Sequence, residues 1–210
     1  MAAADVVVCC LFSDEQLHQV LLTDGALAHA RPGTVVASHV SGHMRLLEEL
    51  AAEAPVGVEI VDAPVSGTAP EILEGRLTVL LGGSPDAVQR VEAVVAAYGD
   101  PVMRCGTLGH AMAIKLINNA LFSAHLRLAG EAQRIAHAMG VGSAELVAAV
   151  SKCSGASAAL SRLGANEFAV MEPHARPFLM KDVAVVEDIL GELGVDLGEL
   201  GEVLRPYRRP

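Results

Sequence analysis

The stretch Gly106-Thr-Leu-Gly-His-Ala-Met-Ala-Ile-Lys115-Leu-Ile-Asn118-Asn119 opens a long, almost wholly apolar helical pattern that runs to Gly140. Lys115, Asn118 and Asn119 stand at positions i, i+3 and i+4, so a helix places all three on one face. Apolar residues fill the remaining directions, as in a helix that is buried on all sides. A lysine there must reach water, pair with an anion or acquire a lowered pKa. The alternative is a lysine at an exposed helix start, with its stem lying over apolar surface.

Composition and charge exclude several classes of protein. Of the 210 residues, 52% are hydrophobic and 19% are charged, which is enough for a sizeable core. The net charge of −10 argues against a nucleic-acid partner, which normally meets a basic patch. No apolar run approaches the ~20 residues of a membrane span, and no basic segment precedes the first apolar run as in a signal peptide. We therefore expect a cytoplasmic protein with no membrane partner.

No metal site is expected. The four cysteines and eight histidines are scattered, and no spacing among them resembles a ligand set.

The first half of the chain alternates between strand and helix signals. Strands are predicted over residues 5–11, 34–38, 58–62, 77–81 and 101–104. Helix starts are predicted at Ser13, with Gln16 completing a capping box, at Ser41 and at Ser84, with a short helical turn over 69–74. This order predicts βαβ units and a largely parallel sheet.

No strand signal follows Gly106. Helices are predicted over residues 106–139, 143–150, 156–163 and 182–193, and residues 205–210 are predicted to form a frayed tail. The sequence thus predicts an α/β domain over residues 1–105 and an all-helical domain over residues 106–210.

Ligands of parallel sheets gather at the carboxyl ends of the strands. Three segments qualify: Leu11-Phe12-Ser13, Ser38-His39-Val40-Ser41, and Asp62-Ala-Pro-Val-Ser66-Gly67-Thr68. In the third, Gly67 lets backbone approach a ligand, and Ser66 with neighbouring N–H groups can hold a carboxylate. An ordinary turn is the alternative. Gly82-Gly83 resembles a phosphate cradle, but a plain strand–helix turn accounts for it and no lysine follows.

Three motifs occur together and in order: Asp62-Ala-Pro-Val-Ser-Gly67, Gly106-x-x-Gly109-x-x-x-x-x-Lys115-x-x-Asn-Asn119, and Lys181-Asp182. Together they resemble the β-hydroxyacid dehydrogenase family, which includes 3-hydroxyisobutyrate and 6-phosphogluconate dehydrogenases. The similarity extends from about Ala4 to about Val195. It implies a Rossmann-like domain followed by an all-α domain, oxidation of a small 3-hydroxy acid with NAD or NADP, and a dimer or tetramer formed through the helical part.

The resemblance also implies roles for individual residues. Lys115 would be the catalytic acid–base, and Asn119 would orient the substrate oxygen. Ser66 and Gly67 would bind the substrate carboxylate. The cofactor would contact Leu11, Phe12, Ser38, His39 and Lys181. A free lysine has a pKa of about 10.4, so burial would have to lower it for Lys115 to act as a base near neutral pH.

The sequence departs from the family pattern at the cofactor. The family begins with a strand, a Gly-x-Gly-x-x-Gly turn and a helix that bind the pyrophosphate, and this chain contains no such motif. We therefore expect an N-terminally incomplete Rossmann-like domain that binds NAD(P) weakly or not at all. The segment Ser38-His39-Val40-Ser41-Gly42 replaces the family's Ser-Thr-x-x-Pro, and Thr68 replaces a second glycine.

Two functions remain open from the sequence. One is an NAD(P)-dependent 3-hydroxyacid dehydrogenase, favoured by Lys115, Asn119, Ser66 and Lys181. The other is a truncated, non-catalytic relative that acts as a dimerising or small-acid-binding protein, favoured by the absent glycine motif.

Overall fold

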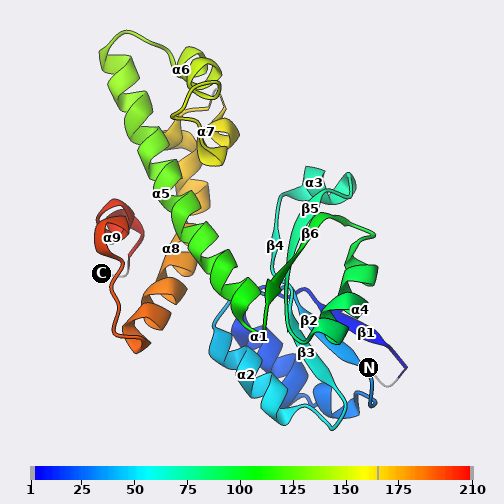
Figure 1. Ribbon diagram of the computed structural model, residues 1–210. Helices are drawn as coiled ribbons and strands as arrows, with labels where there is room; N and C mark the ends of the chain where they lie inside the picture. The colour runs from blue at the N-terminus through cyan, green and yellow to red at the C-terminus, as the bar shows by residue number, and fades with distance from the viewer. Residues whose placement is uncertain (1–2, 165, 209–210) are drawn as a thin grey trace. The chain divides into compact units, whose positions relative to one another are not determined.

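The computed structural model describes residues 3–164 and 166–208, and the contacts divide the chain into two compact units. The first unit comprises Met1–Leu116 and the second Ile117–Pro210. The boundary falls inside one long helix, α5 (His110–Ala138). Figure 1 shows the elements of each unit.

The first unit is built on a six-stranded sheet with the order β1-β2-β3-β5-β4, in which β6 also pairs with β5. Its strands are β1 (Val6–Cys9), β2 (Val35–Ser38), β3 (Glu59–Asp62), β4 (Val65–Ser66), β5 (Leu77–Gly82) and β6 (Gly99–Gly106). The pairs β1–β2, β2–β3 and β5–β6 are parallel, which confirms the Rossmann-like, mainly parallel character of the domain.

One part of the predicted topology is wrong, because β5 runs antiparallel to β3 and β4. The connection from Ser66 to Leu77 contains only the short helix α3 (Ala69–Leu73). A crossover between parallel strands needs about a dozen residues or more, so this short connection reverses the chain instead.

The register brings the ends of five strands into one row. Cys9 pairs with Ser38, Ser38 with Asp62, Asp62 with Gly82, and Gly82 with Gly106. Each of these five residues is the last of its strand, although β5 and β6 run against β1–β3. We call these residues the strand-end row. The loops that leave β1, β2 and β3, and the segment that leads into α5, all start from it.

The remaining helices of this unit are α1 (Asp14–His18), α2 (Met44–Glu53) and α4 (Pro85–Val95). A π-helical turn (Gln19–Thr23) and a 3₁₀ turn (Leu27–His29) extend α1. Ser13 and Ser84 cap α1 and α4, as predicted. The cap of α2 was predicted wrongly. It is His43, whose Nδ1 accepts from the Arg45 amide at 3.2 Å, and not Ser41.

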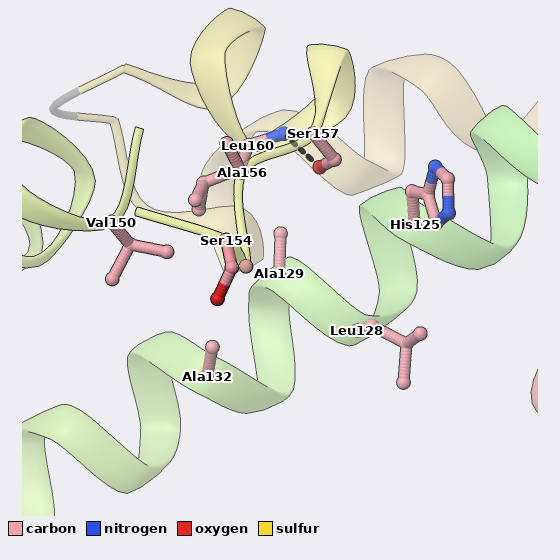
Figure 2. A pocket seen from close by; sticks show the side chains of 10 residues that line it. His125, Leu128, Ala129, Ala132, Val150, Ser154, Ala156, Ser157 and Leu160 are labelled. Atoms are coloured by element: carbon pink, nitrogen blue, oxygen red, sulfur yellow. Dashed lines mark hydrogen bonds between the residues drawn. The ribbon is translucent and has the colours of Figure 1, made fainter. Parts of the chain in front are cut away.

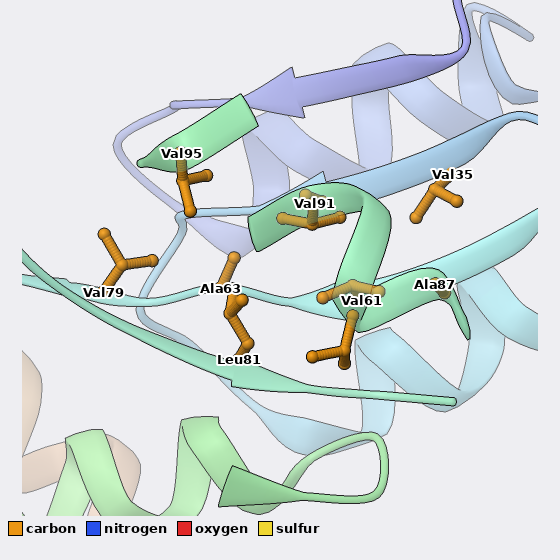
Figure 3. Close-up of a cluster of buried hydrophobic side chains, with 10 residues drawn as sticks. Val35, Val61, Ala63, Val79, Leu81, Ala87, Val91 and Val95 are labelled. Carbon is orange, nitrogen blue, oxygen red and sulfur yellow. The ribbon is translucent and has the colours of Figure 1, made fainter. Parts of the chain in front are cut away.

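The alternation of side chains along the strands explains why helices cover both faces of this sheet. Val35, Ala37, Val61, Ala63, Val79 and Leu81 pack against the buried face of α4, as Figure 3 shows. The residues between them point to the opposite face, and Val36, Ile60 and Leu80 are buried there. Because both faces are covered, β2 and β5 are mostly buried and apolar along their length.

The second unit contains most of α5 together with α6 (Ser143–Val150), α7 (Ala158–Leu163), α8 (Phe168–Glu192), α9 (Gly198–Leu204) and a 3₁₀ turn, Arg205–Tyr207. The predicted all-helical character is confirmed. Its centre contains Ala129, Val147, Leu160 and Leu163. The buried Gln133 amide joins α5 to the start of α8, since it donates to the Asn166 carbonyl and accepts from the Phe168 amide, both at 2.9 Å.

Two predictions for this unit are wrong. Helix α8 begins at Phe168 and not near residue 182, and it contains Pro173 and Pro177. Both prolines are exposed, so water can satisfy the carbonyl oxygens that lose their helical partners. The tail is not frayed up to Arg208, because Tyr207 is buried. The last residues of the predicted tail, Arg209 and Pro210, lie outside the described residues.

Among the described residues, no helix combines the length and apolar character required to cross a membrane. Within residues 3–164 and 166–208, no group of three or more histidine, cysteine or acidic side chains has the arrangement of a metal site.

Candidate active site

Lys115 lies on the sixth residue of α5, and its side chain is buried, with 9% of the residue exposed. Ala111, Met112 and Leu116 beside it on the helix are buried as well. The alternative of a lysine at an exposed helix start is therefore wrong.

The start of α5 is held by the carboxylate of Asp62, which is fully buried at the end of β3. Its Oδ1 accepts from the Gly109 amide at 2.9 Å, and its Oδ2 accepts from the Met112 amide at 2.7 Å. Burial raises the pKa of Asp62 above its ordinary value, while these backbone hydrogen bonds act in the opposite direction. Our sequence reasoning missed this role. The signal was an acidic residue at the last position of a buried strand.

Ser66 and Gly67 follow four and five residues after Asp62, at the end of β4. Ser66 is half-buried and Gly67 is exposed. Gly67 has a φ of 153°, and a Cβ atom at this position would lie 2.7 Å from the side chain of Leu77. The backbone conformation thus favours glycine, and any side chain here would also have to displace Leu77. Thr68, in the place of the family's second glycine, donates its amide to Glu71 Oε2 at 2.8 Å and starts α3.

The segment after β2 is fixed by the ring of His39. Its Nδ1 lies 2.6 Å from the Ala63 carbonyl oxygen and its Nε2 lies 2.7 Å from the Tyr98 hydroxyl. A carbonyl only accepts, so Nδ1 carries the proton and Nε2 accepts from Tyr98. Burial lowers the pKa of His39, opposed by the bond to Ala63. Ser38 is buried, and its hydroxyl accepts from the Val40 amide at 3.3 Å.

The segment after β1 presents an aromatic ring to solvent. Phe12 is 63% exposed, while its amide donates to Gln16 Oε1 at 2.9 Å. Gln16 therefore reaches back past the cap Ser13 to the amide of Phe12, one residue further than the predicted capping box requires. Leu11 beside it is half-buried.

In the second unit, Asn119 contacts Asp182, a residue to which the sequence reasoning assigned no role. The Asn119 amide donates to Asp182 Oδ2 at 3.0 Å, and Asn119 Oδ1 accepts from Asn118 at 3.2 Å. Lys181 is half-buried on α8, next to Asp182. The Asn-Asn and Lys-Asp motifs, 63 residues apart, are thus in direct contact through Asn119 and Asp182.

Three cavities formed by the described residues are not lined by these side chains. A cavity of about 410 Å³ in the second unit lies between α5 and the segment from α6 to α7, where Figure 2 shows small side chains and His125 around it. Another, of about 310 Å³, lies beside the start of α8, and one of about 470 Å³ lies between α1 and α2. The linings of all three lack the predicted site residues.

The residues of the first unit fit one part of a nicotinamide dinucleotide better than the other. The exposed Phe12 ring and the backbone of the His39 segment lie at the ends of neighbouring strands, where they would be open to a nucleoside. The surroundings of α1 are less suitable for binding the pyrophosphate. Helix α1 carries Asp14 and Glu15 in its first turn, and these carboxylates repel phosphate charge.

Comparison with known proteins identifies the family. The profile of the NAD binding domain of 6-phosphogluconate dehydrogenase matches residues 1–121. That of the NAD-binding domain of NADP-dependent 3-hydroxyisobutyrate dehydrogenase matches residues 109–207. The chain belongs to the β-hydroxyacid dehydrogenase family. It is therefore related throughout its described length to oxidoreductases that use NAD or NADP.

Individual relatives agree with this membership. An uncharacterized oxidoreductase of Mycobacterium tuberculosis is 35% identical over 98% of this chain and 71% of its own length. The L-threonate dehydrogenase of Escherichia coli O6:H1 is 32% identical over 65% of this chain and 46% of its own length. The solved structure of M. tuberculosis 3-hydroxyisobutyrate dehydrogenase with L-serine has a TM-score of 0.83 over 98% of this chain and 74% of that chain, at 23% identity. This last likeness concerns the fold of the family.

The buried His39 predicts a dependence of stability on pH. Its ordinary pKa of 6.5 applies to the unfolded chain and is lowered in the folded protein. At pH values between the folded and unfolded pKa, the unfolded chain binds more protons than the folded protein does. The contribution of neutral His39 to stability is therefore complete above pH 6.5 and falls as the pH decreases through this window. Urea unfolding from pH 7.5 to 5 should show this loss, and His39→Gln should reduce the proton uptake on unfolding by up to about one proton. His29→Gln, at an exposed ring, serves as the control. Equal pH slopes for the parent and His39→Gln would contradict the assignment.

Proposed function

We propose that the protein transfers a hydride between a small 3-hydroxy acid and a nicotinamide cofactor, with Lys115 as the acid–base. The observation that carries this proposal is the burial of Lys115 directly after a helix start that a buried carboxylate fixes. An amine that is held in place and largely removed from water can exchange a proton with a substrate hydroxyl near neutral pH.

Each of the other residues has a role that its surroundings support. The Asn119 amide has two N–H donors and Asp182 takes one, so the other can bind the substrate oxygen. Ser66 and the exposed backbone at Gly67 would bind the substrate carboxylate. Lys115 would take the hydroxyl proton in the oxidation direction and return it in the reverse direction. The nicotinamide cofactor, when bound, supplies the hydride acceptor.

We propose a small hydroxy acid as the substrate class, because relatives are named for such compounds. Relatives include L-threonate dehydrogenases and the NAD-dependent L-serine dehydrogenase of Pseudomonas aeruginosa, both named for small hydroxy acids. For the cofactor we propose contacts with Leu11, Phe12, Ser38, His39 and Lys181, through side chains or the adjacent backbone. Because the Ser38 hydroxyl and both nitrogens of His39 are already bonded within the protein, the backbone of that segment is the more suitable contact. A cytoplasmic location stays a prediction from the sequence.

The role of Lys115 can be tested in a chimaera that adds a glycine-rich strand–turn–helix unit ahead of the chain. Lys115→Met should lower the turnover of small 3-hydroxy acids by about 10²–10⁴-fold, because a general acid–base contributes this much. Lys152→Met, at an exposed lysine, should retain parental turnover. Near-parental turnover of Lys115→Met, measured by NAD(P)H absorbance, would show that Lys115 is not the acid–base.

The 210-residue chain by itself should bind NAD and NADP weakly. The acidic first turn of α1 disfavours the pyrophosphate, and this observation favours the second candidate function, a small-acid-binding protein without turnover. Calorimetric titration should detect no micromolar affinity for either cofactor, whereas Asp14→Asn/Glu15→Gln should bind more tightly than the parent. Micromolar binding by the parent would remove the case for a non-catalytic protein.

We also propose a homo-oligomer formed through the second unit. Helix α5 exposes Ile117, Leu121, Leu128 and Ile135, at spacings of four and seven residues that align them along one stripe. A stripe of this kind on a single chain favours packing against another copy. Light scattering should give a dimer or tetramer for the parent and a monomer for Leu121→Glu/Leu128→Glu. The control is Leu193→Glu, at another exposed leucine that directly follows α8. An unchanged mass for the double variant would exclude this stripe as the interface.

A further inference from the structure

We propose that Asp62 is a positioning residue, whose buried carboxylate fixes the first turn of α5 and through it the ε-amine of Lys115. The functional meaning of this inference rests on the proposed acid–base role of Lys115. The geometry itself lies entirely within the first unit and does not depend on that role.

The carboxylate replaces a cap that α5 cannot provide for itself. The first amides of a helix have no partner within it, and the residue before α5 is Gly109, which has no side chain. Asp62 accepts from the Gly109 and Met112 amides with its two separate oxygens. Hydrogen bonds to a charged acceptor are stronger than neutral ones, and the negative charge suits the positive end of the helix dipole.

Asp62 is itself held on both sides by the sheet. It pairs with Ser38 on β2 and with Gly82 on β5, in the strand-end row. A Cβ atom at Gly82 would collide with the Asp62 carboxylate, so glycine leaves the space that the carboxylate fills. The paired strands around Asp62 therefore set the position of the first turn of α5.

Lys115 follows Met112 by three residues, which is about one helical turn. A shift of the first turn therefore moves the lysine with it. On the other side, β3 continues through β4 to Ser66, four residues after Asp62. The Asp62 side chain thus fixes the position of Lys115 relative to β4, the strand that ends at the proposed carboxylate-binding residue Ser66.

The composition of the chain makes the inference measurable without turnover. The only lysines in the sequence are Lys115, Lys152 and Lys181, so each amine can be followed separately. In Asp62→Asn, one oxygen is replaced by an NH₂ group that faces a backbone donor. We expect the rate of reductive methylation of Lys115 at pH 7.5, measured by peptide mass spectrometry, to rise roughly 5- to 30-fold, as a local opening equilibrium does when a buried hydrogen bond is lost. The ¹³Cε signal of Lys115 should shift, while those of Lys152 and Lys181 stay in place.

A matched control separates positioning from stability. Ser84→Ala removes the cap of α4 in the same unit, where the Ser84 hydroxyl accepts from the Ala87 amide at 3.2 Å. It should lower the melting temperature and leave the methylation rate and ¹³Cε signal of Lys115 unchanged. If Asp62→Asn lowers the melting temperature but also leaves Lys115 unchanged, Asp62 is a helix cap only and the inference is overturned.

A second variant and a measurement on the parent chain cover a failure of Asp62→Asn to fold. Asp62→Glu keeps both acceptors and the charge but adds one methylene, so it should also shift the Lys115 signal. If neither variant folds, hydrogen exchange in the parent decides. The Gly109 and Met112 amides should be protected as strongly as the centre of α5, and exchange at the rate of a frayed helix end would overturn the inference.

These outcomes are distinct from those for the proposed function. A shift of the Lys115 ¹³Cε signal in Asp62→Asn, together with parental turnover of Lys115→Met in the chimaera, would support Asp62 as a positioning residue. The same pair of results would reject Lys115 as the catalytic acid–base. An unchanged Lys115 signal in Asp62→Asn, together with lost turnover of Lys115→Met, would retain Lys115 as the acid–base and reject Asp62 as its positioning residue.

Discussion

The hydrogen bonds of the buried Asp62 carboxylate to α5 are the interaction on which the arrangement of the first unit depends. A buried charge is costly unless its oxygens are satisfied, and here two backbone amides satisfy them. The same amides would be costly at a buried helix start without an acceptor. Each group thus removes the desolvation penalty of the other, and the end of the sheet and the start of the helix are held at a fixed distance.

The strand-end row explains why the contact between Asp62 and α5 lies beside the proposed catalytic residues. In a fully parallel sheet, all strand ends lie at one edge by direction alone. Here β5 and β6 run the other way, and the same result comes from register, because β3 extends through β4 and lets β5 pair along the extension. The loops after Cys9 and Ser38, the turn after Asp62 and the segment into α5 therefore still leave from neighbouring positions.

The sequence predicted the classes of element well, since the alternation of buried strands with capped helices has a clear local signal. The direction of β5 was mispredicted, although the ten residues between Ser66 and Leu77 were too few for a crossover. The extent of α8 was missed because Pro173 and Pro177 usually end a helix, and only the exposure of both positions permits it.

Candidate residues could be chosen from the sequence by their type and spacing. The contacts that hold these residues in place could not. Lys115, Ser66 and Asn119 stood out by type and spacing, and the burial of Lys115 agreed with its apolar surroundings. The support of these residues depends on contacts between distant segments. Asp62 with Met112, Asn119 with Asp182, and His39 with Tyr98 are separated by 50, 63 and 59 residues. No local pattern encodes such distances.

The burial of Tyr207 has a practical consequence for work with this protein. Its ring is covered by the Arg176 guanidinium at 5.6 Å, and Arg176 also donates to the Pro206 carbonyl at 2.9 Å, so the 3₁₀ turn after α9 is attached to α8. Shortened versions that remove this turn would uncover a buried surface on α8. Versions of the protein made for crystallisation or for affinity purification should therefore keep the chain through Arg208 and place any added peptide beyond it.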